Sequence, residues 1–123
     1  MDAVNSSLKL IACILALTLA APSAFAFWGD KDKAAAQTGA VLFRDRGCAR
    51  CHGANGVGDK KGPALTDLRR NKQWNVEHLR TQILNGGQKM PPFGEALSDP
   101  EVTQLIAYLR AKHRPVAPSA PTQ

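Results

Sequence analysis

The feature that most constrains this 123-residue chain is the run Cys48-Ala49-Arg50-Cys51-His52. Cysteines three positions apart project from the same side of one helical turn, so both sulfurs can reach one flat group. The histidine that follows directly can place an imidazole nitrogen next to that group. A chain that holds a covalent group at a single turn has to build the rest of its fold around it.

A C-x-x-C pair occurs in more than one kind of site. A redox dithiol needs only the pair, whereas a zinc site needs further Cys or His ligands. The chain has no second C-x-x-C and no H-x3–5-H pair, so a four-ligand zinc site is hard to assemble. C-x-x-C-H is the attachment signature of a c-type haem. The motif therefore indicates one covalent haem on Cys48 and Cys51, with His52 as a ligand of its iron.

The first residues have the pattern of an export signal. Lys9 supplies positive charge, residues 10–21 form an apolar run, and residues 24–26 are an A-x-A cleavage site. Residues 1–26 are therefore interpreted as a cleaved signal peptide, which predicts a periplasmic protein. An uncleaved membrane anchor is the alternative, because residues 10–27 carry no charge and have the minimum length of a spanning helix.

Removal of the signal changes the inventory of sulfur atoms. Cys13 and Met1 leave with it, so the remaining cysteines are both in the C-x-x-C-H motif and Met90 is the one methionine left. Such a chain has no disulfide, although domains of this size usually gain from a staple. A covalently attached porphyrin can take that role, because it adds a large apolar body to the core.

Composition divides the rest of the chain into three parts. Residues 27–33 are a short polar leader, residues 34–114 form the ordered domain, and residues 115–123 are a Pro/Ala-rich tail that is expected to be disordered. Within the domain, residues 53–63 contain four glycines and no apolar periodicity, which predicts a loop.

The chain has a net charge of +6, with 16 Lys and Arg against 10 Asp and Glu. Positive charge favours solubility, and it can also steer the protein toward an acidic face of a redox partner or toward an anionic membrane surface. The basic residues are scattered and the chain is predicted to be exported, so nucleic acid is not expected as a partner.

Apolar residues at helical spacing predict three helices, and no segment has a convincing strand pattern. The first helix covers residues 33–46 and ends at Gly47. Asn75 can cap the second helix, whose apolar face is expected to include Val76 and which ends at Gly86.

The last predicted helix has clear boundaries. Ser98 and Glu101 form a capping box, with Pro100 in the first turn. Residues 112–114 suit the C-terminal end of the helix dipole, and Pro115 stops the helix. The expected fold is all-α, a small helical bundle wrapped around one covalently attached haem.

A haem iron bound by histidine has a sixth coordination position. Met90 is the first candidate, because two glycines before it allow a sharp turn and two prolines after it fix the backbone. His78, His113 and a position left open to water are the alternatives. A methionine that only fills the core would more often lie on a helix.

With these residues in view, the sequence resembles the bacterial class I monohaem c-type cytochromes over residues 36–112. The resemblance rests on short segments spread along the domain, which are Gly39 to Phe43, Gly47 to His52, Gly62 to Leu65, Gly87 to Phe93, and Tyr108-Leu109 in the last helix.

The resemblance implies a haem held inside the helices, with His52 and Met90 as its two axial ligands. It implies that the first and last helices cross tightly at Gly39 and Tyr108. It also implies that the carbonyl of Pro63 accepts a hydrogen bond from Nδ1 of His52, which fixes the tautomer of that ring.

The expected function is a one-electron carrier of a respiratory chain, in which the iron cycles between Fe(II) and Fe(III). It is expected to be a monomer and not an enzyme, with an electron donor and an electron acceptor as its protein partners. Lys60, Lys61, Lys72 and Lys89 are the candidate docking residues. Two alternatives remain, namely the haem subunit of a larger membrane oxidoreductase and a haem enzyme or gas sensor with an open sixth position.

Overall fold

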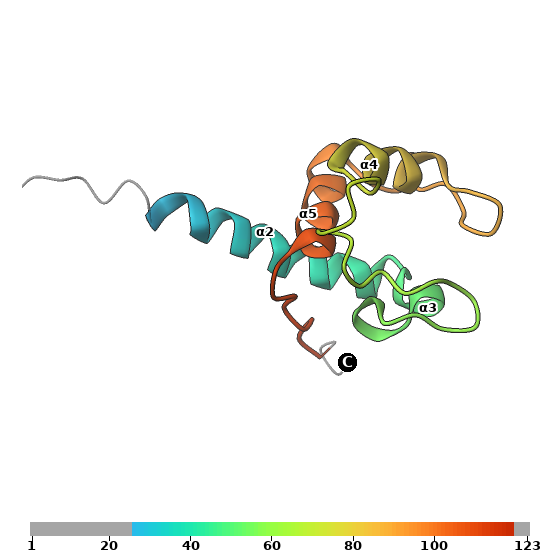
Figure 1. Ribbon diagram of the computed structural model, residues 1–123, viewed down its shortest axis with the longest axis horizontal. Coiled ribbons are helices and arrows are strands. Elements are labelled where there is room, and N and C mark those ends of the chain that lie inside the picture. The colour runs from blue at the N-terminus through green and yellow to red at the C-terminus, as the bar shows by residue number, and fades with distance from the viewer. Residues whose placement is uncertain (1–25, 120–123) are drawn as a thin grey trace, which may run out of the picture.

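Four α-helices follow one another along residues 26–119, the part of the chain that the computed structural model describes (Figure 1). No strand occurs in this range, where an isolated bridge pairs Asp59 with Gly62. The all-α fold expected from the sequence is confirmed. The helices are α2 (Ala26–Asp45), α3 (Ala49–His52), α4 (Val76–Asn85) and α5 (Asp99–Arg110), and a 3-10 turn, η1 (Ala54–Gly56), follows α3.

The crossing of α2 and α5 is the centre of the domain. A Cβ atom built on Gly39 would lie 2.7 Å from Cβ of Tyr108 and would overlap the carbonyl oxygen of Gln104. Glycine therefore lets the two backbones touch. One turn further along α2, the rings of Phe43 and Tyr108 pack with their centroids 5.3 Å apart. The crossing at Gly39 and Tyr108 is thus present, as the resemblance implied.

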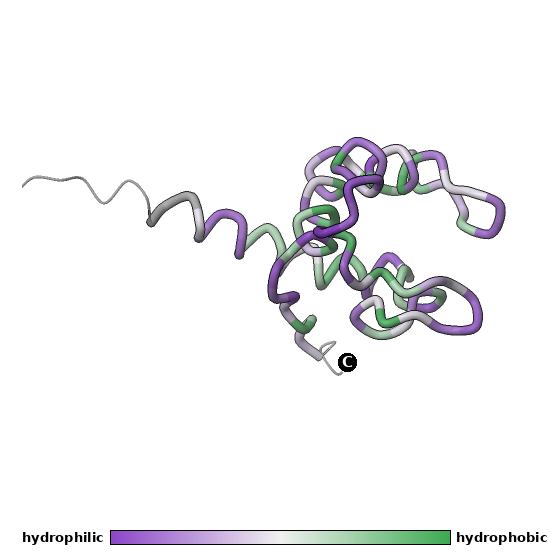
Figure 2. The backbone as a smooth tube through the Cα atoms, viewed as in Figure 1, coloured by the Kyte–Doolittle hydropathy of each residue, from purple (hydrophilic) through white to green (hydrophobic). Residues whose placement is uncertain are grey.

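A single cluster of buried apolar side chains joins α2, α4 and α5. Figure 2 shows hydrophobic segments where these helices meet and hydrophilic segments along the outer loops. Full burial of a leucine or valine side chain stabilises a fold by about 1.5–3 kcal/mol. The cluster consists of Ala40, Phe43, Leu68, Leu79, Ile83, Leu97, Val102, Leu105, Ile106, Tyr108 and Leu109.

Helix caps formed as the sequence predicted. The side chain of Asn75 accepts a hydrogen bond of 2.8 Å from the backbone N–H of His78, and Gly86 ends α4 with a φ of 72°. At the start of α5 the backbone N–H of Ser98 donates to the carboxylate of Glu101 at 2.8 Å, which completes the capping box. Gly86 and the Ser98 capping box therefore fix where the segment between α4 and α5 begins and ends.

Three details of the helices differ from the predictions. α2 begins at Ala26, so residues 27–33 are its first turns and not a separate leader. The two lysines in this stretch are good helix formers, whereas Gly29 disfavours helix. α5 ends at Arg110, so residues 112–114 lie beyond the helix. Val76 is 51% exposed and does not belong to the core face of α4.

The first part of the tail lies along α2. Residues 115–119 have no regular secondary structure, but Nε2 of Gln37 donates to the carbonyl of Val116 at 3.4 Å and Arg44 donates to the carbonyl of Pro118. Ala117 packs against the core cluster. These contacts differ from the free tail that composition predicted. The proposed signal peptide before Ala26 and the last four residues of the tail lie outside the described residues.

Candidate haem-binding cleft

The C-x-x-C-H motif occupies a short helix that follows a sharp turn. α2 ends at Asp45, and Gly47 then adopts a φ of +81° that few other residues tolerate. Cys48 stands at the N-cap of α3, and its carbonyl accepts a hydrogen bond of 3.0 Å from the backbone N–H of His52. The two cysteines and the histidine are therefore carried by one turn, as their spacing predicted.

Both cysteines are free thiols and both are partly buried. Burial raises the pKa of the Cys48 thiol, and the negative charge that Cys51 can carry adds to this effect. Cys48 is thus protonated at neutral pH, which is the opposite of the depressed thiol pKa that redox dithiols show. Free thiols with this geometry fit thioether attachment of a porphyrin.

The imidazole of His52 is oriented by the loop that follows it. Nδ1 of His52 lies 2.9 Å from the carbonyl oxygen of Pro63, and a proline carbonyl can only accept, so Nδ1 carries the proton. Nε2 is then the nitrogen with a free lone pair, which a metal can bind. The residue before Pro63 has to be glycine, because a Cβ on Gly62 would lie 2.8 Å from the carbonyl oxygen of Cys51.

Three adjoining cavities in the structure are each lined by His52 and Met90, and their volumes are about 370, 120 and 40 Å³. Their linings are mainly apolar, which suits the body of a porphyrin. We call them together the cleft. Further residues that line it are Cys48, Cys51, Pro63, Leu65, Leu68, Trp74, Gln82, Ile83, Phe93 and Leu109.

Met90 reaches the cleft from a tight loop between α4 and α5. The backbone N–H of Gly87 donates to the carbonyl of Met90 at 2.8 Å, and that of Phe93 donates to Ile83 at 3.1 Å. These bonds close residues 86–93 into a compact turn, and Met90 is held partly buried against the core. Figure 1 shows this orange-yellow turn and α3 on the same side of the domain, away from the start of α2.

The two alternative histidine ligands lie elsewhere. His78 is exposed on α4, and its ring packs on that of Trp74 with the centroids 4.5 Å apart. His113 is exposed beyond the end of α5. Neither residue lines the cleft, whereas Trp74 does. Of the three candidate side chains for the sixth position, Met90 is the one that the fold brings to the same cavities as His52.

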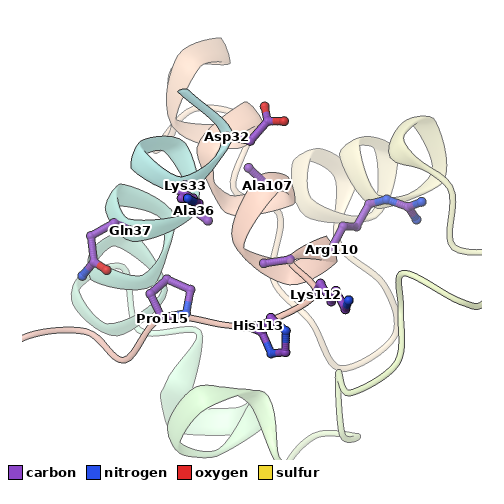
Figure 3. Close-up of a pocket in the computed structure, with 10 residues that line it drawn as sticks. Asp32, Lys33, Ala36, Gln37, Ala107, Arg110, Lys112, His113 and Pro115 are labelled. Atoms are coloured by element: carbon purple, nitrogen blue, oxygen red, sulfur yellow. The ribbon is translucent and has the colours of Figure 1, made fainter. Parts of the chain in front are cut away.

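A further cavity of about 540 Å³ does not belong to the cleft. It lies between the first half of α2 and the end of α5, where Figure 3 shows Lys33, Gln37, His113 and Pro115 around it. Neither the cysteines nor Met90 line this cavity. It is a groove between helices that meet only over part of their length.

Comparison with known proteins decides which family the cleft belongs to. Residues 34–109 match the model of the family described as cytochrome c oxidase, cbb3-type, subunit III. The chain belongs to this family of monohaem c-type cytochrome domains. No helix among residues 26–119 is long and apolar enough to cross a membrane, and no solved structure matches the chain significantly.

Several curated c-type cytochromes are similar to this cytochrome. Cytochrome c6 of Rippkaea orientalis is 32% identical over 79 residues, which is 63% of this chain and 70% of that protein. Cytochrome c-555 of Methylococcus capsulatus is 29% identical over 120 residues, 97% of this chain and 94% of that protein. Cytochrome c oxidase subunit 2 of Alkalihalophilus pseudofirmus is 31% identical over 87 residues, 62% of this chain but 25% of that protein.

Membership in the c-type cytochromes implies a covalently attached haem c. The residues present fit this group, because the cleft combines two free thiols, an imidazole with its Nε2 available and a thioether within mainly apolar walls. Among residues 26–119 no group of three or more Cys, His, Asp or Glu could hold a metal ion by itself.

Sequence reasoning missed three residues around the cleft. Nε2 of Gln82 donates to the carbonyl of Gly86 at 2.9 Å and lies 4.0 Å from Sδ of Met90. Arg110 and Arg114 donate to the backbone carbonyls of Trp74 and Leu65, two residues of the loop that lines the cleft. Of the three, only Gln82 could have been found from the sequence. It lies one turn before Gly86, which ends α4, so its side chain can reach the carbonyl of that glycine.

Proposed function

We propose that this cytochrome is a periplasmic one-electron carrier whose haem is attached to Cys48 and Cys51 and bound axially by His52 and Met90. The observation that carries the proposal is that His52 and Met90, from segments 38 residues apart, line the same three cavities. Two protein ligands leave no coordination position for a substrate. The protein then moves charge without making or breaking a covalent bond, and it is not an enzyme.

The bound haem supplies an iron that is stable in both its Fe(II) and Fe(III) states. The chain contributes the tuning of that pair. The Pro63 carbonyl holds the Nδ1 proton of His52 and so raises the basicity of the ring. The Met90 thioether and the apolar cleft lining disfavour the extra positive charge of Fe(III) and raise the reduction potential.

Redox proteins are the proposed partners, and the mouth of the cleft is the proposed contact. Lys61 and Lys89 are exposed and line the small cavity that also contains Cys48, Cys51 and Met90. Their charge suits an acidic docking face, and small transient contacts suit a carrier that must leave its partner quickly. Two further candidates, Lys60 and Lys72, are exposed but line no part of the cleft.

The optical spectrum of the purified protein in both redox states tests this proposal. We expect a six-coordinate low-spin spectrum with the ferric band typical of sulfur ligation, and no rapid binding of carbon monoxide by the ferrous protein at neutral pH. Rapid carbon monoxide binding would instead assign a haem enzyme or gas sensor with an open sixth position. In a second experiment, the double variant Cys48→Ala, Cys51→Ala should release its haem into acidic organic solvent, and the wild type should not.

A second candidate function is that of a haem subunit in a larger membrane oxidoreductase. It is favoured by the description of the matching family and by the similarity to cytochrome c oxidase subunit 2. Native purification separates the two candidates. A carrier would be recovered in the periplasmic fraction as a monomer whose sequence starts near Phe27. A subunit would stay with the membrane fraction and co-purify with larger chains.

A further inference from the structure

Arg114 turns back from beyond the end of α5 and binds three backbone carbonyls. Nη1 donates to Asn55 at 3.1 Å, and Nη2 donates to Leu109 at 2.9 Å and also to Leu65. The guanidinium carbon lies 5.5 Å from the centre of the Tyr108 ring. The side chain is partly buried, and burial lowers its pKa below the usual value, although an arginine remains charged at physiological pH.

One of these carbonyls, that of Leu65, belongs to a loop with little other support. Residues 57–75 contain no helix or strand, and the described hydrogen bonds within this stretch are those of short turns. The backbone N–H of Leu65 donates to the carbonyl of Gly56 at 2.8 Å, which joins the loop to the end of η1, next to Asn55. A Cβ on Gly56 would lie 2.9 Å from Nη1 of Arg114, which shows how closely the cation is seated.

This loop also carries the acceptor of the axial histidine. Pro63, whose carbonyl lies 2.9 Å from Nδ1 of His52, is two residues before Leu65. Both backbone polar groups of Leu65 are held. Its N–H donates to the carbonyl of Gly56, and its carbonyl accepts from Arg114. Fixing Leu65 therefore limits how far the Pro63 carbonyl can move from the imidazole.

We infer that Arg114 is a positioning residue, which ties Leu65 of the loop to Asn55 of η1 and thereby keeps the Pro63 carbonyl in hydrogen-bond contact with His52. The inference rests on the proposed function, in which His52 binds the haem iron. Charge-assisted hydrogen bonds of this kind are among the strongest in proteins. One cation that binds carbonyls from η1, from the loop and from α5 replaces the secondary structure that the loop lacks.

The chain offers a matched control. Arg110 is also partly buried, is the last residue of α5, and donates through Nη1 to the carbonyls of Trp74 at 2.6 Å and Leu68 at 3.3 Å. Figure 3 shows its side chain extending from α5 toward α4, away from α2. Loss of Arg110 removes the same charge and the same kind of bond, but on the part of the loop that does not adjoin Pro63.

The test measures how fast the Nδ1 proton of His52 exchanges with water in the haem-loaded ferrous protein, by nitrogen-15 NMR. Arg114→Leu should speed this exchange by about tenfold, which corresponds to about 1.4 kcal/mol, and Arg110→Leu should change it by less than about twofold. The free energy of unfolding is measured for both variants, so that a general loss of stability is recognised. The inference is overturned if Arg114→Leu leaves the rate unchanged, or if both variants speed it equally.

Arg114→Lys keeps the charge but cannot reach all three carbonyls from one ammonium group, so it should give an intermediate rate. If Arg114→Leu does not fold with haem, this variant decides, and a wild-type exchange rate in Arg114→Lys overturns the inference. Failure of the proposed function is a separate result, because the ring protons of His52 in the wild-type protein would then lack the large shift that a haem ring imposes.

Discussion

Nδ1 of His52 and the carbonyl oxygen of Pro63 lie 2.9 Å apart, and no side chain takes part in the loop's half of this contact. The acceptor is a backbone group of a proline, which has a fixed φ and no N–H of its own. The orientation of the imidazole is therefore set by the path of the backbone. This orientation of the ring depends on the polypeptide fold alone and not on any other ligand of the metal.

Gly62→Ala should disturb this contact more than its size suggests. The added Cβ would lie 2.8 Å from the carbonyl oxygen of Cys51 and 3.2 Å from Nδ1 of His52, so either the loop or the ring must move. Overpacking of this kind costs about 1–3 kcal/mol. Denaturant unfolding of the haem-loaded protein checks the loss, and a stability equal to that of the wild type would show that the loop gives way freely.

Met90→Ala should leave the haem attached but open its sixth position. We expect the ferric band of sulfur ligation to disappear, the reduction potential to fall because a soft ligand that favours Fe(II) is lost, and carbon monoxide to bind the ferrous protein rapidly. Optical titration and potentiometry measure the three effects. His78→Ala is the matched control, since its ring lies outside the cleft, and an unchanged spectrum and potential in Met90→Ala would refute the assignment of the ligand.

Gly39→Ala should weaken the central helix crossing. The new Cβ would be forced against the backbone of Gln104 and against Cβ of Tyr108, so α2 and α5 must separate at a loss of about 1–3 kcal/mol. Gly29→Ala is the control within the same helix, because no atom lies within 4 Å of the position that its new methyl carbon would take. That change should raise stability by up to about 1 kcal/mol through helix propensity. Equal effects of the two substitutions on thermal unfolding would contradict a tight crossing.

Reversing the charge at the mouth of the cleft should slow electron transfer. The double variant Lys61→Glu, Lys89→Glu is expected to lower the second-order rate with an acidic redox protein by about tenfold at low salt, with a weaker dependence on ionic strength. Lys33→Glu serves as the control. It reverses a charge on α2, at a residue that lines the cavity between α2 and α5 and not the cleft. Stopped-flow rates at several salt concentrations measure the difference, and an equal response of both variants would place docking elsewhere.

Glu101 should contribute to stability in a defined pH window. Hydrogen bonds from the Ser98 backbone, from Arg46 and from the Ser98 hydroxyl lower the pKa of its carboxyl from 4.5 to about 2. Because the folded-state pKa is the lower one, the carboxylate stabilises the fold above about pH 4.5, and this contribution is lost as the pH falls toward 2. Glu101→Gln should therefore show a smaller decrease in stability than the wild type between these pH values. Circular dichroism at successive pH values provides the comparison, and parallel curves would rule the contribution out.

Local sequence patterns were sufficient to place the C-x-x-C-H motif on one helical turn and to predict the caps of α4 and α5. The cysteines and His52 are close in sequence, so one helical turn brings them together, and the caps at Asn75 and Ser98 depend on residues within three positions. Met90 could be singled out because the predicted removal of the signal would leave no other thioether. Each of these predictions depends on contacts between near neighbours in the chain.

Long-range contacts account for what the sequence did not predict. The side chain of Arg114 finds Asn55 and Leu65, which are 59 and 49 positions away, and nothing in the residues near Arg114 indicates this. Residues 112–114 were expected to continue α5, because their local sequence does not reveal these distant contacts. The chain instead leaves the helix at Ala111. Val76 has helical spacing with Leu79 and Ile83, but no element covers it at the start of α4.

The projecting start of α2 has a practical consequence. Residues 29–34 of this helix are exposed and Ala36 is the first buried side chain of the helix, so with a rise of 1.5 Å per residue about 15 Å of helix extends beyond the packed core. Figure 1 shows this end on the side opposite to α3 and the turn over residues 86–93. A surface, electrode or fused protein attached to the N-terminal end of α2 would be held by a built-in spacer and would leave the C-x-x-C-H side of the domain turned outward.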